Sequence, residues 1–293
     1  MRITVFTPTY NRGYRIGDLY NSLKQQTFHD FEWVVVDDGS TDNTEELFQQ
    51  YLTEKCFFPI RYVKRENGGK HRAINQGVSM AQGELFFIVD SDDYLPDQAL
   101  EIIDSVEKTI PDNTKANFAG VCGQKGYSEE TPIGKSFEGD ILDITTLQRS
   151  KYHVTGDKSE VFYTDILRRY PFPEYKGENF VTECVVWDQI AADGYKLRFF
   201  NHVVMICEYL PDGLSAQGNT LFEKNPKAWG LYIYQCGLFG KISGIAKWNE
   251  ILNYYYTTRN KLTFRQIARI LRMHPIILWL RLFGLRLFYR LYG

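Results

Sequence analysis

Three carboxylates within four residues form the densest group of chemically useful side chains in the sequence. Asp90, Asp92 and Asp93 directly follow the apolar run Leu85–Val89, which is typical of a buried strand. Carboxylates this close repel one another in an apolar neighbourhood, and a hard divalent cation removes that cost while it gains oxygen ligands. The pattern therefore favours a Mg²⁺ or Mn²⁺ site. The alternative is a plain helix N-terminus, with Ser91 or Asp92 as its capping residue.

A second pair of carboxylates, Asp37 and Asp38, stands at the end of another apolar run. Capping of the following helix accounts for Thr41 or Asp42, but it does not account for this pair, which suits hydrogen bonding to a base or a ribose. Tyr10, on the turn after the first strand, offers an aromatic face for stacking. The alternative is an ordinary surface tyrosine, because the chain has 20 tyrosines.

Paired glycines precede a lysine in the segment Asn67-Gly68-Gly69-Lys70. Glycines just before a helix let the backbone approach a phosphate closely, and both a helix N-terminus and Lys70 favour an anion. A simple turn with a solvated lysine is the alternative. The segment is not a Gly-x-x-x-x-Gly-Lys-Ser/Thr loop, and no Gly-x-Gly-x-x-Gly follows the first strand. Nucleotide-hydrolysing P-loop proteins and dinucleotide-binding folds are therefore both disfavoured.

The first half of the chain alternates short apolar runs with helical patterns. This alternation predicts a mostly parallel sheet with helices on both of its faces. Ligands of such sheets bind outside the carboxyl ends of the strands, and each polar segment described above directly follows a predicted strand. We therefore expect these segments to share one edge of the sheet. The predicted strands cover residues 3–6, 31–37, 60–65 and 85–89, and the predicted helices cover 18–26, 44–52 and 70–81.

The formal net charge of −2 argues against a free-standing nucleic-acid-binding protein, because such domains are usually strongly basic. The near balance hides a split along the chain. Residues 241–293 hold ten Lys and Arg against one acid, Glu250, for a net charge of +9. Residues 1–240 are left with 24 basic and 35 acidic residues, for a net charge of −11. An acidic body with a basic tail indicates that the two parts have different tasks.

The cysteines and the hydropathy pattern both favour a cytoplasmic protein. Five widely spaced cysteines without a Cys-x-x-Cys pair predict buried free thiols in a reducing compartment. The N-terminus has one charge and a very short apolar run, so we expect no signal peptide. The longest charge-free apolar run of the tail, Pro275–Leu280, is far shorter than the roughly 20 residues that a membrane-spanning helix needs.

The segment 264–292 has the composition of a helix that lies in the headgroup layer of an anionic membrane. Leu, Phe, Trp and Tyr dominate it beyond Pro275, and arginines interrupt them. The alternatives are docking on the protein's own core or a dimer interface. Three arginines are predicted on one helical face and three more interrupt the apolar stretch: Arg265, Arg269 and Arg272, then Arg281, Arg286 and Arg290.

Four segments at the strand ends together resemble the inverting family 2 glycosyltransferases with a GT-A fold. They are Thr7–Arg12, Asp37–Thr44, Asn67–Asn75 and Val89–Asp93, and the resemblance covers about residues 1–210. Each motif is moderately specific alone, whereas four in this order and at this spacing are highly specific. The resemblance implies a GT-A nucleotide-diphospho-sugar transferase fold of the α/β class, followed here by a helical, basic C-terminal tail.

The resemblance also implies a use for each residue on the nucleotide side. Tyr10 would stack on uracil, Asp38 would hydrogen-bond it, and Lys70 would approach the nucleotide. Asp90-Ser91-Asp92 matches the family's Asp-x-Asp motif, with Asp90 toward the ribose and Asp92 on the metal through the diphosphate. The metal set is therefore Asp92 and Asp90, with Mn²⁺ or Mg²⁺ as the cofactor. The nucleotide-binding set is Pro8, Tyr10, Asn11, Arg12, Asp37, Asp38, Asn67, Lys70, Asp90 and Ser91.

The family places a catalytic carboxylate at the start of a helix in its acceptor half, usually within an acidic pair. Glu183 is the best match as the base, although Thr182 departs from the pair. The alternative is a first-turn glutamate on a helix over 180–193, which the helix dipole favours. Asp188 is a reserve candidate on a different helix face. Asp157, before what reads as a short helix, could shape the acceptor pocket.

The function that the resemblance implies is metal-dependent, inverting transfer of a sugar from a nucleotide-diphosphate donor, with UDP favoured. The acceptor would be a saccharide or lipid-linked saccharide in bacterial surface-polysaccharide biosynthesis, reached at the inner face of the cell membrane. We expect a catalytic domain over 1–215, with a nucleotide-binding half (1–115) and an acceptor half (116–215), and a helical region over 216–293. The alternatives are a sugar-nucleotide pyrophosphorylase and a non-catalytic sugar-nucleotide-binding or membrane-surface protein.

Overall fold

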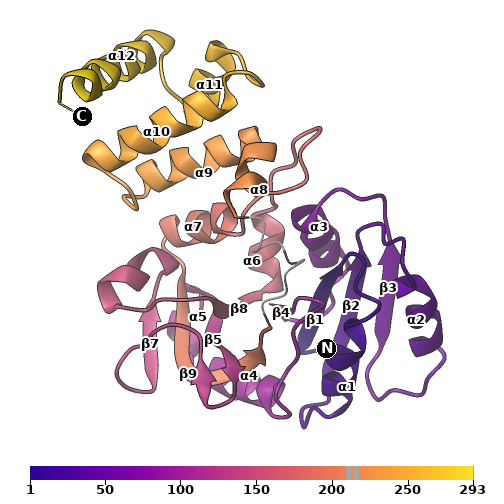
Figure 1. The fold of residues 1–293 in the computed structure, drawn as a ribbon. Helices are drawn as coiled ribbons and strands as arrows, with labels where there is room; N and C mark the ends of the chain where they lie inside the picture. Colours follow the sequence, from indigo (N-terminus) through magenta and orange to yellow (C-terminus); the bar gives the residue numbers. More distant parts are fainter. Residues whose placement is uncertain (209–212, 214–217, 293) are drawn as a thin grey trace. The chain divides into compact units, whose positions relative to one another are not determined.

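The computed structural model describes the backbone of residues 1–208, 213 and 218–292, and the side chains of these residues up to 284 (Figure 1). The chain divides into two compact units, Met1–Phe172 with Gln189–Leu210, and Pro173–Asp188 with Pro211–Gly293. The turn-rich loop expected to end the catalytic domain near residue 215 lies, apart from Gly213, outside the described residues. Each unit is described by itself below.

The first unit is built on a mixed sheet with the strand order β3-β2-β1-β4-β8-β5-β9-β7, and β6 pairs with β5 (Figure 1). The strands β1 to β4 are parallel to one another, as predicted, whereas β8 runs antiparallel between β4 and β5. The strand bounds are β1 Ile3–Thr9, β2 Phe31–Asp37, β3 Ile60–Lys64, β4 Leu85–Ile88, β5 Phe118–Ser128, β6 Thr131–Pro132, β7 Ile141–Ile144, β8 Lys158–Tyr163 and β9 Lys196–Ile206.

Helices cover both faces of this sheet, as the alternating pattern predicts. The side chains of β1 alternate between the faces. Ile3 and Val5 pack in one cluster with residues of α1, α2 and α4, whereas Phe6 on the opposite face lies against Gly77 of α3. A Cβ at Gly77 would come within 2.1 Å of the Phe6 ring, so only glycine allows this close approach. The helices are α1 Ile16–Lys24, α2 Thr44–Tyr51, α3 Lys70–Met80, α4 Ala99–Lys108, α5 Asp112–Lys115, the 3₁₀ helix Thr146–Tyr152 and α6 Thr164–Arg169.

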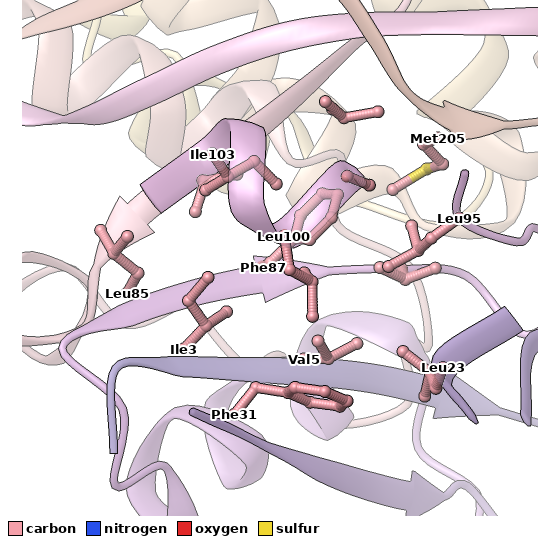
Figure 2. Packing of buried hydrophobic residues seen from close by; sticks show 14 of the residues in the cluster. Ile3, Val5, Leu23, Phe31, Leu85, Phe87, Leu95, Leu100, Ile103 and Met205 are labelled. Carbon is pink, nitrogen blue, oxygen red and sulfur yellow. The ribbon is translucent and has the colours of Figure 1, made fainter. Parts of the chain in front are cut away.

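The main hydrophobic core fixes the strand ends in place. Every residue of β1 and β2 is buried, which explains why apolar and β-branched residues dominate both strands. Figure 2 shows Val5, Phe31 and Phe87 from three adjacent strands packing with Leu100 and Ile103 of α4. Truncation of a buried phenylalanine of this kind to alanine costs about 3–5 kcal/mol of stability. This packing therefore holds the strands, and the sheet edge at their ends, in place.

The second unit is helical and has its own core. Tyr254 and Ile267 pack there with Leu278 and Leu282 of α12, and the Thr263 side chain caps the following helix by accepting a hydrogen bond from the Gln266 amide. The helical tail expected from the sequence is therefore present. Its helices are α8 Asn219–Lys224, α9 Pro226–Leu238, α10 Gly244–Thr258, α11 Phe264–Ile270 and α12 Pro275–Tyr292, and α7 Cys184–Ala192 begins in this unit.

Two predictions about the tail and the cysteines have clear outcomes. The prediction that Arg265, Arg269 and Arg272 share one helical face is wrong for Arg272, because α11 ends at Ile270. Arg272 has a left-handed φ of 51°, and its guanidinium lies over the Tyr234 ring. The side chains of Arg286 and Arg290 lie outside the described residues. All five cysteines are free thiols, as predicted, but only Cys122, Cys207 and Cys236 are buried, whereas Cys56 and Cys184 are partly exposed. Within the part of the chain that the structure describes, no helix has the length and apolar character to cross a bilayer.

Candidate active site

The carboxyl ends of β1, β2 and β4 meet at one edge of the sheet, as the sequence predicts for the polar segments that follow them. Thr9 and Asp37 are register partners at the ends of β1 and β2, and the Asp38 amide donates to the Thr9 carbonyl at 2.8 Å. The Asn11 side chain, on a backbone with φ of 53°, accepts from the Thr41 amide at 2.8 Å. The turns after β1 and β2 therefore brace each other.

Asp38 connects the end of β2 to the loop before α3. Its two carboxylate oxygens accept hydrogen bonds from the Gly68 amide at 2.9 Å and the Gly69 amide at 2.6 Å, and its carbonyl accepts from the Asn67 side chain at 2.8 Å. Burial raises the pKa of Asp38, although these amides oppose the rise. Gly69 has a φ of 99°, a conformation that favours glycine at the start of α3. The predicted contact of Asp38 with a base stays a prediction.

Asp37, in contrast, faces into the protein. It is completely buried, and its oxygens accept hydrogen bonds from the Ser40 amide at 2.7 Å and the Tyr62 hydroxyl at 2.6 Å. These bonds shape the turn that presents Asp38. Pro8 and Ser91, two further residues of the predicted nucleotide-binding set, are also buried. They would therefore contribute to a site through the backbone around them rather than through an exposed side chain.

A compact group of opposite charges surrounds the residues after β4. The ammonium of Lys70, at the start of α3, lies 2.7 Å and 2.9 Å from the two carboxylate oxygens of Asp90. Burial alone would raise the pKa of Asp90, but Lys70, Lys125 and Arg12 outweigh it and lower the pKa. Burial and the neighbouring Asp90 raise the pKa of Asp92, whose carboxylate lies 3.9 Å from the Arg12 guanidinium. Charge on Asp92 is therefore costly unless a further cation balances it.

The chemistry of this pair fits a hard divalent cation. Asp90 and Asp92 supply carboxylate oxygens, and Mg²⁺ is usually held by one or two carboxylates together with substrate phosphates. The described residues contain no group of three or more His, Cys, Asp or Glu that could hold a metal without such a substrate. The pair alone is therefore suited to a metal that arrives with a diphosphate.

Exposed aromatic side chains and a largely buried arginine lie on the turn at this edge. Tyr10 keeps 48% of its surface exposed directly after β1, so its ring face is accessible. The Arg12 guanidinium lies 5.9 Å from the centre of the Tyr14 ring, which holds it close to the same turn. An open ring beside an arginine is suited to a planar base that carries phosphates.

Two residues of this region, Lys125 and Cys207, were not predicted from the sequence as functional, and both contact Asp93 of the predicted carboxylate group. Asp93 is buried and accepts a hydrogen bond from the Cys207 thiol at 3.2 Å. The ammonium of Lys125 on β5 lies 3.9 Å from the same carboxylate. Burial raises the pKa of Asp93 to about 7. The sequence signals for this group are Asp93 in the carboxylate cluster and a lysine inside the buried strand β5, and no local pattern connects them because the three residues are far apart along the chain.

The candidates for the acceptor side are distributed over both units. Glu183 lies in the second unit and directly precedes α7, and its carbonyl accepts from the Val186 and Trp187 amides at 3.0 Å. The observed helix, Cys184–Ala192, is shorter at its start than the predicted 180–193. Glu183 is half-buried, so its side chain is partly accessible.

The other two acceptor-side candidates differ in their surroundings. Asp188 is buried in the second unit and forms an ion pair with Lys241 at 2.7 Å. Burial lowers the pKa of Lys241, but Asp188 more than compensates and the pKa is raised. Asp157 is exposed in the first unit and precedes β8, so the short helix predicted there is wrong. The extended segment fits the sheet because Lys158 to Phe162 pair with β5.

A family model described as Glycosyl transferase family 2 matches residues 4–138. The poly(ribitol-phosphate) beta-N-acetylglucosaminyltransferase TarS of Staphylococcus aureus is 38% identical over 171 residues, 57% of this chain and 28% of that protein. Glycosyltransferase GlyG of Streptococcus pneumoniae is 36% identical over 102 residues, 34% of this chain and 33% of that protein. The GalNAc(5)-diNAcBac-PP-undecaprenol beta-1,3-glucosyltransferase of Campylobacter jejuni is 26% identical over 194 residues, 64% of this chain and 58% of that protein. The chain thus matches about a third or less of the length of GlyG and TarS.

Solved structures show the same fold. S. aureus TarS 1-349 in complex with UDP has a TM-score of 0.59 at 19% identity, over 90% of this chain and 73% of that chain. The mannosyltransferase PcManGT from Pyrobaculum calidifontis, in complex with GDP-Man and Mn²⁺, has a TM-score of 0.51 at 20% identity, over 92% of this chain and 72% of that chain. The solved structures therefore show a GT-A α/β fold for this chain, and every nucleotide-side candidate lies within residues 4–138, the part that matches the Glycosyl transferase family 2 model.

Proposed function

We propose that the protein is a metal-dependent, inverting glycosyltransferase that uses a UDP-sugar donor. The observation that carries this proposal is the strand-edge charge group, in which Lys70 and Arg12 face Asp90 and Asp92. Next to it lies Asp38, whose carboxylate accepts hydrogen bonds from the Gly68 and Gly69 amides. We call five residues the donor site: Arg12, Asp38, Lys70, Asp90 and Asp92. The TarS structures in complex with UDP and UDP-GlcNAc support UDP as the nucleotide.

The residues of the donor site, together with Tyr10, each have a defined task in this proposal. Tyr10 stacks on the uracil, and Asp38 accepts a hydrogen bond from it. Asp90 and Asp92 hold Mn²⁺ or Mg²⁺, which acts as a Lewis acid on the leaving diphosphate when it is bound. Lys70 and Arg12 add positive charge beside the same phosphates, and this charge favours the nucleoside diphosphate as it departs.

Glu183 is the proposed general base. It takes the proton of the acceptor hydroxyl while the new bond to the anomeric carbon forms and the bond to the diphosphate breaks, so one displacement inverts that carbon. Glu183 is favoured over Asp188 because the latter is held by Lys241 in a buried ion pair. Asp157 is proposed only as an acceptor-pocket residue, because it is exposed beside β8.

The proposed acceptor is a saccharide or a lipid-linked saccharide of surface-polysaccharide biosynthesis. The name of the Campylobacter jejuni relative states that it acts on an undecaprenol-linked saccharide, which supports a lipid-linked acceptor. TarS acts on poly(ribitol-phosphate) according to its name, so a polymer of this kind is the second acceptor class to test.

Helix α12 supports a peripheral position on the inner face of an anionic membrane. Its buried side contributes Leu278 and Leu282 to the core of the second unit. Its other described apolar side chains are each more than half exposed: Ile276, Ile277, Trp279, Leu280 and Phe283. Exposed apolar patches of this kind mark interaction sites. The net charge of +9 over residues 241–293 favours anionic lipid and disfavours a second copy of the same surface.

The test of the reaction is a donor-hydrolysis screen over sugar nucleotides with Mn²⁺ and Mg²⁺, because slow hydrolysis needs no known acceptor. We expect release of UDP from a UDP-sugar, dependent on the metal and lost in Asp92→Asn. Binding of the nucleotide with no release of UDP in the presence of any saccharide acceptor would favour a non-catalytic sugar-nucleotide-binding protein. Consumption of pyrophosphate with formation of UTP would identify a pyrophosphorylase.

The test of the membrane contact is sedimentation of the full chain with vesicles of phosphatidylglycerol and phosphatidylcholine. We expect binding that rises with the phosphatidylglycerol content and is weakened in Trp279→Ser/Phe283→Ser. The matched control is Ile245→Ser, an exposed apolar residue on α10, which should bind as the unaltered chain does. Equal binding by all three chains would contradict the assignment of α12.

A further inference from the structure

Lys125 is a buried cation that reaches the donor site from the other half of the sheet. It lies on β5, where its backbone pairs with Met205 of β9 and its carbonyl accepts from the Ile133 amide at 2.8 Å. Its side chain is only 19% exposed, so the sheet fixes the direction of the ammonium. β5 begins beyond the residues that the sequence assigns to the nucleotide-binding half.

Charged residues lie near the Lys125 ammonium, but its ion-pair contact within the described residues is long. It forms an ion pair with the Asp93 carboxylate at 3.9 Å, a distance that is too long for a hydrogen bond. Lys70, in contrast, contacts both oxygens of Asp90 at 2.7 Å and 2.9 Å. Lys125 also acts on Asp90, because the lysine charge helps to lower the pKa of that carboxyl.

A largely buried ammonium gains free energy when an anion accepts hydrogen bonds from it. Asp93 leaves the N–H donors of this ammonium available, because it lies 3.9 Å away and already accepts a hydrogen bond from the Cys207 thiol. A phosphate is the anion that lysine binds well as a point charge. The neighbouring Asp90 is the residue proposed to meet the nucleotide and its metal.

We propose that Lys125 is a third cation of the donor site and contacts the diphosphate of the sugar nucleotide. This inference rests on the proposed function, since it assumes a nucleoside diphosphate as the ligand of that site. Lys125 lies within residues 116–215, which the sequence predicts to be the acceptor half. The proposal therefore gives a donor-binding role to a residue outside the predicted nucleotide-binding half.

The inference makes two predictions of opposite sign for Lys125→Met. UDP should bind more weakly, by about 10-fold to 100-fold, because a hydrogen bond to a charged group is lost. Mn²⁺ alone should bind more tightly, by about threefold or more, because the carboxylates lose a competing positive charge. Damage to the site geometry would instead weaken both ligands together. Lys125→Arg keeps the charge and should restore most of the UDP affinity.

The experiment is isothermal titration of the full chain with UDP alone, with Mn²⁺ alone and with UDP in saturating Mn²⁺. Lys135→Met is the matched control, since it removes the same charge from an exposed position. Lys125→Gln is the second charge-free variant if Lys125→Met does not fold. Weaker UDP binding with tighter Mn²⁺ binding supports the proposal. Unchanged UDP binding, or parallel loss of both ligands, overturns it. Failure of the unaltered chain to bind UDP would instead overturn the proposed donor, so the two failures are distinguishable.

Discussion

In the donor site, acids and bases are paired at short range, whereas the C-terminal helices carry many cations with a single acid beside them. Lys70 meets Asp90 at 2.7 Å, and Arg12 lies near Asp92, so the site is close to electrical balance. Residues 241–293 hold ten basic residues and only Glu250 as an acid. A balanced, buried group is suited to a ligand that brings both charges, such as a metal with a diphosphate. An unbalanced, exposed surface is suited to a partner that is anionic throughout.

The largest expected effect concerns Glu183, which we propose as the general base on the acceptor side. Replacement of a general base typically costs about 10²-fold to 10⁴-fold in rate, so Glu183→Gln should lower turnover by that factor. Its affinity for UDP should not change, because the donor site is intact. Steady-state kinetics with the donor identified by the hydrolysis screen and UDP titration measure the two quantities. Full turnover by Glu183→Gln would remove Glu183 as the base.

The second-largest expected effect concerns Asp188, which we expect to stabilise the folded protein rather than to act as the base. Asp188→Asn leaves the Lys241 ammonium without its buried partner, and breaking such pairs costs about 3–5 kcal/mol. Because Lys241 is one-third exposed, we expect about 2–3 kcal/mol of lost unfolding free energy, measured by urea denaturation. The control is Asp165→Asn, which breaks an exposed pair with Arg168 and should change stability by less than about 1 kcal/mol. Unchanged stability with lost turnover would make Asp188 the better base.

These two carboxylates illustrate what the sequence could and could not predict. The alternation of strands and helices identified the parallel strands and the edge where Asp38, Asp90 and Asp92 meet, because those patterns are local. The ion pair of Asp188 with Lys241 and the contact of Lys125 with Asp93 depend on pairing of distant segments, so no local pattern contains them. The segment after Asp157 was misread as a helix because antiparallel pairing with β5 decides its conformation.

The pH dependence of stability should single out Asp93. Its folded-state pKa of about 7 lies above the ordinary value of about 3.9, so the folded protein favours the protonated carboxyl. Its stabilising contribution is therefore complete below about pH 4 and is lost as the pH rises to about 7. Asp93→Asn should remove this slope, so the unfolding free energy of the variant gains on that of the unaltered chain across this window. Urea denaturation between pH 4 and pH 8 with a chelator measures it, and identical slopes would contradict the assignment.

The smallest effect on stability is expected on the exposed side of α12. Trp279→Ser/Phe283→Ser should change the unfolding free energy by less than about 1 kcal/mol, because both side chains are 55% exposed. Leu278→Ala should cost about 2–5 kcal/mol, since Leu278 is fully buried in the core of the second unit. Thermal and urea denaturation of the three chains measure this contrast. A large loss in the first variant would mean that this face is covered within the protein.

The central claim is that the strand-edge charge group binds a metal and a nucleoside diphosphate together, and one titration tests it directly. Isothermal titration of UDP into the full chain should give a single site whose affinity rises when Mn²⁺ is added. In Asp92→Asn the metal-dependent part of the affinity should disappear, while weak UDP binding in the absence of metal persists. UDP binding that is equal with and without Mn²⁺, or unaffected by Asp92→Asn, would contradict the account.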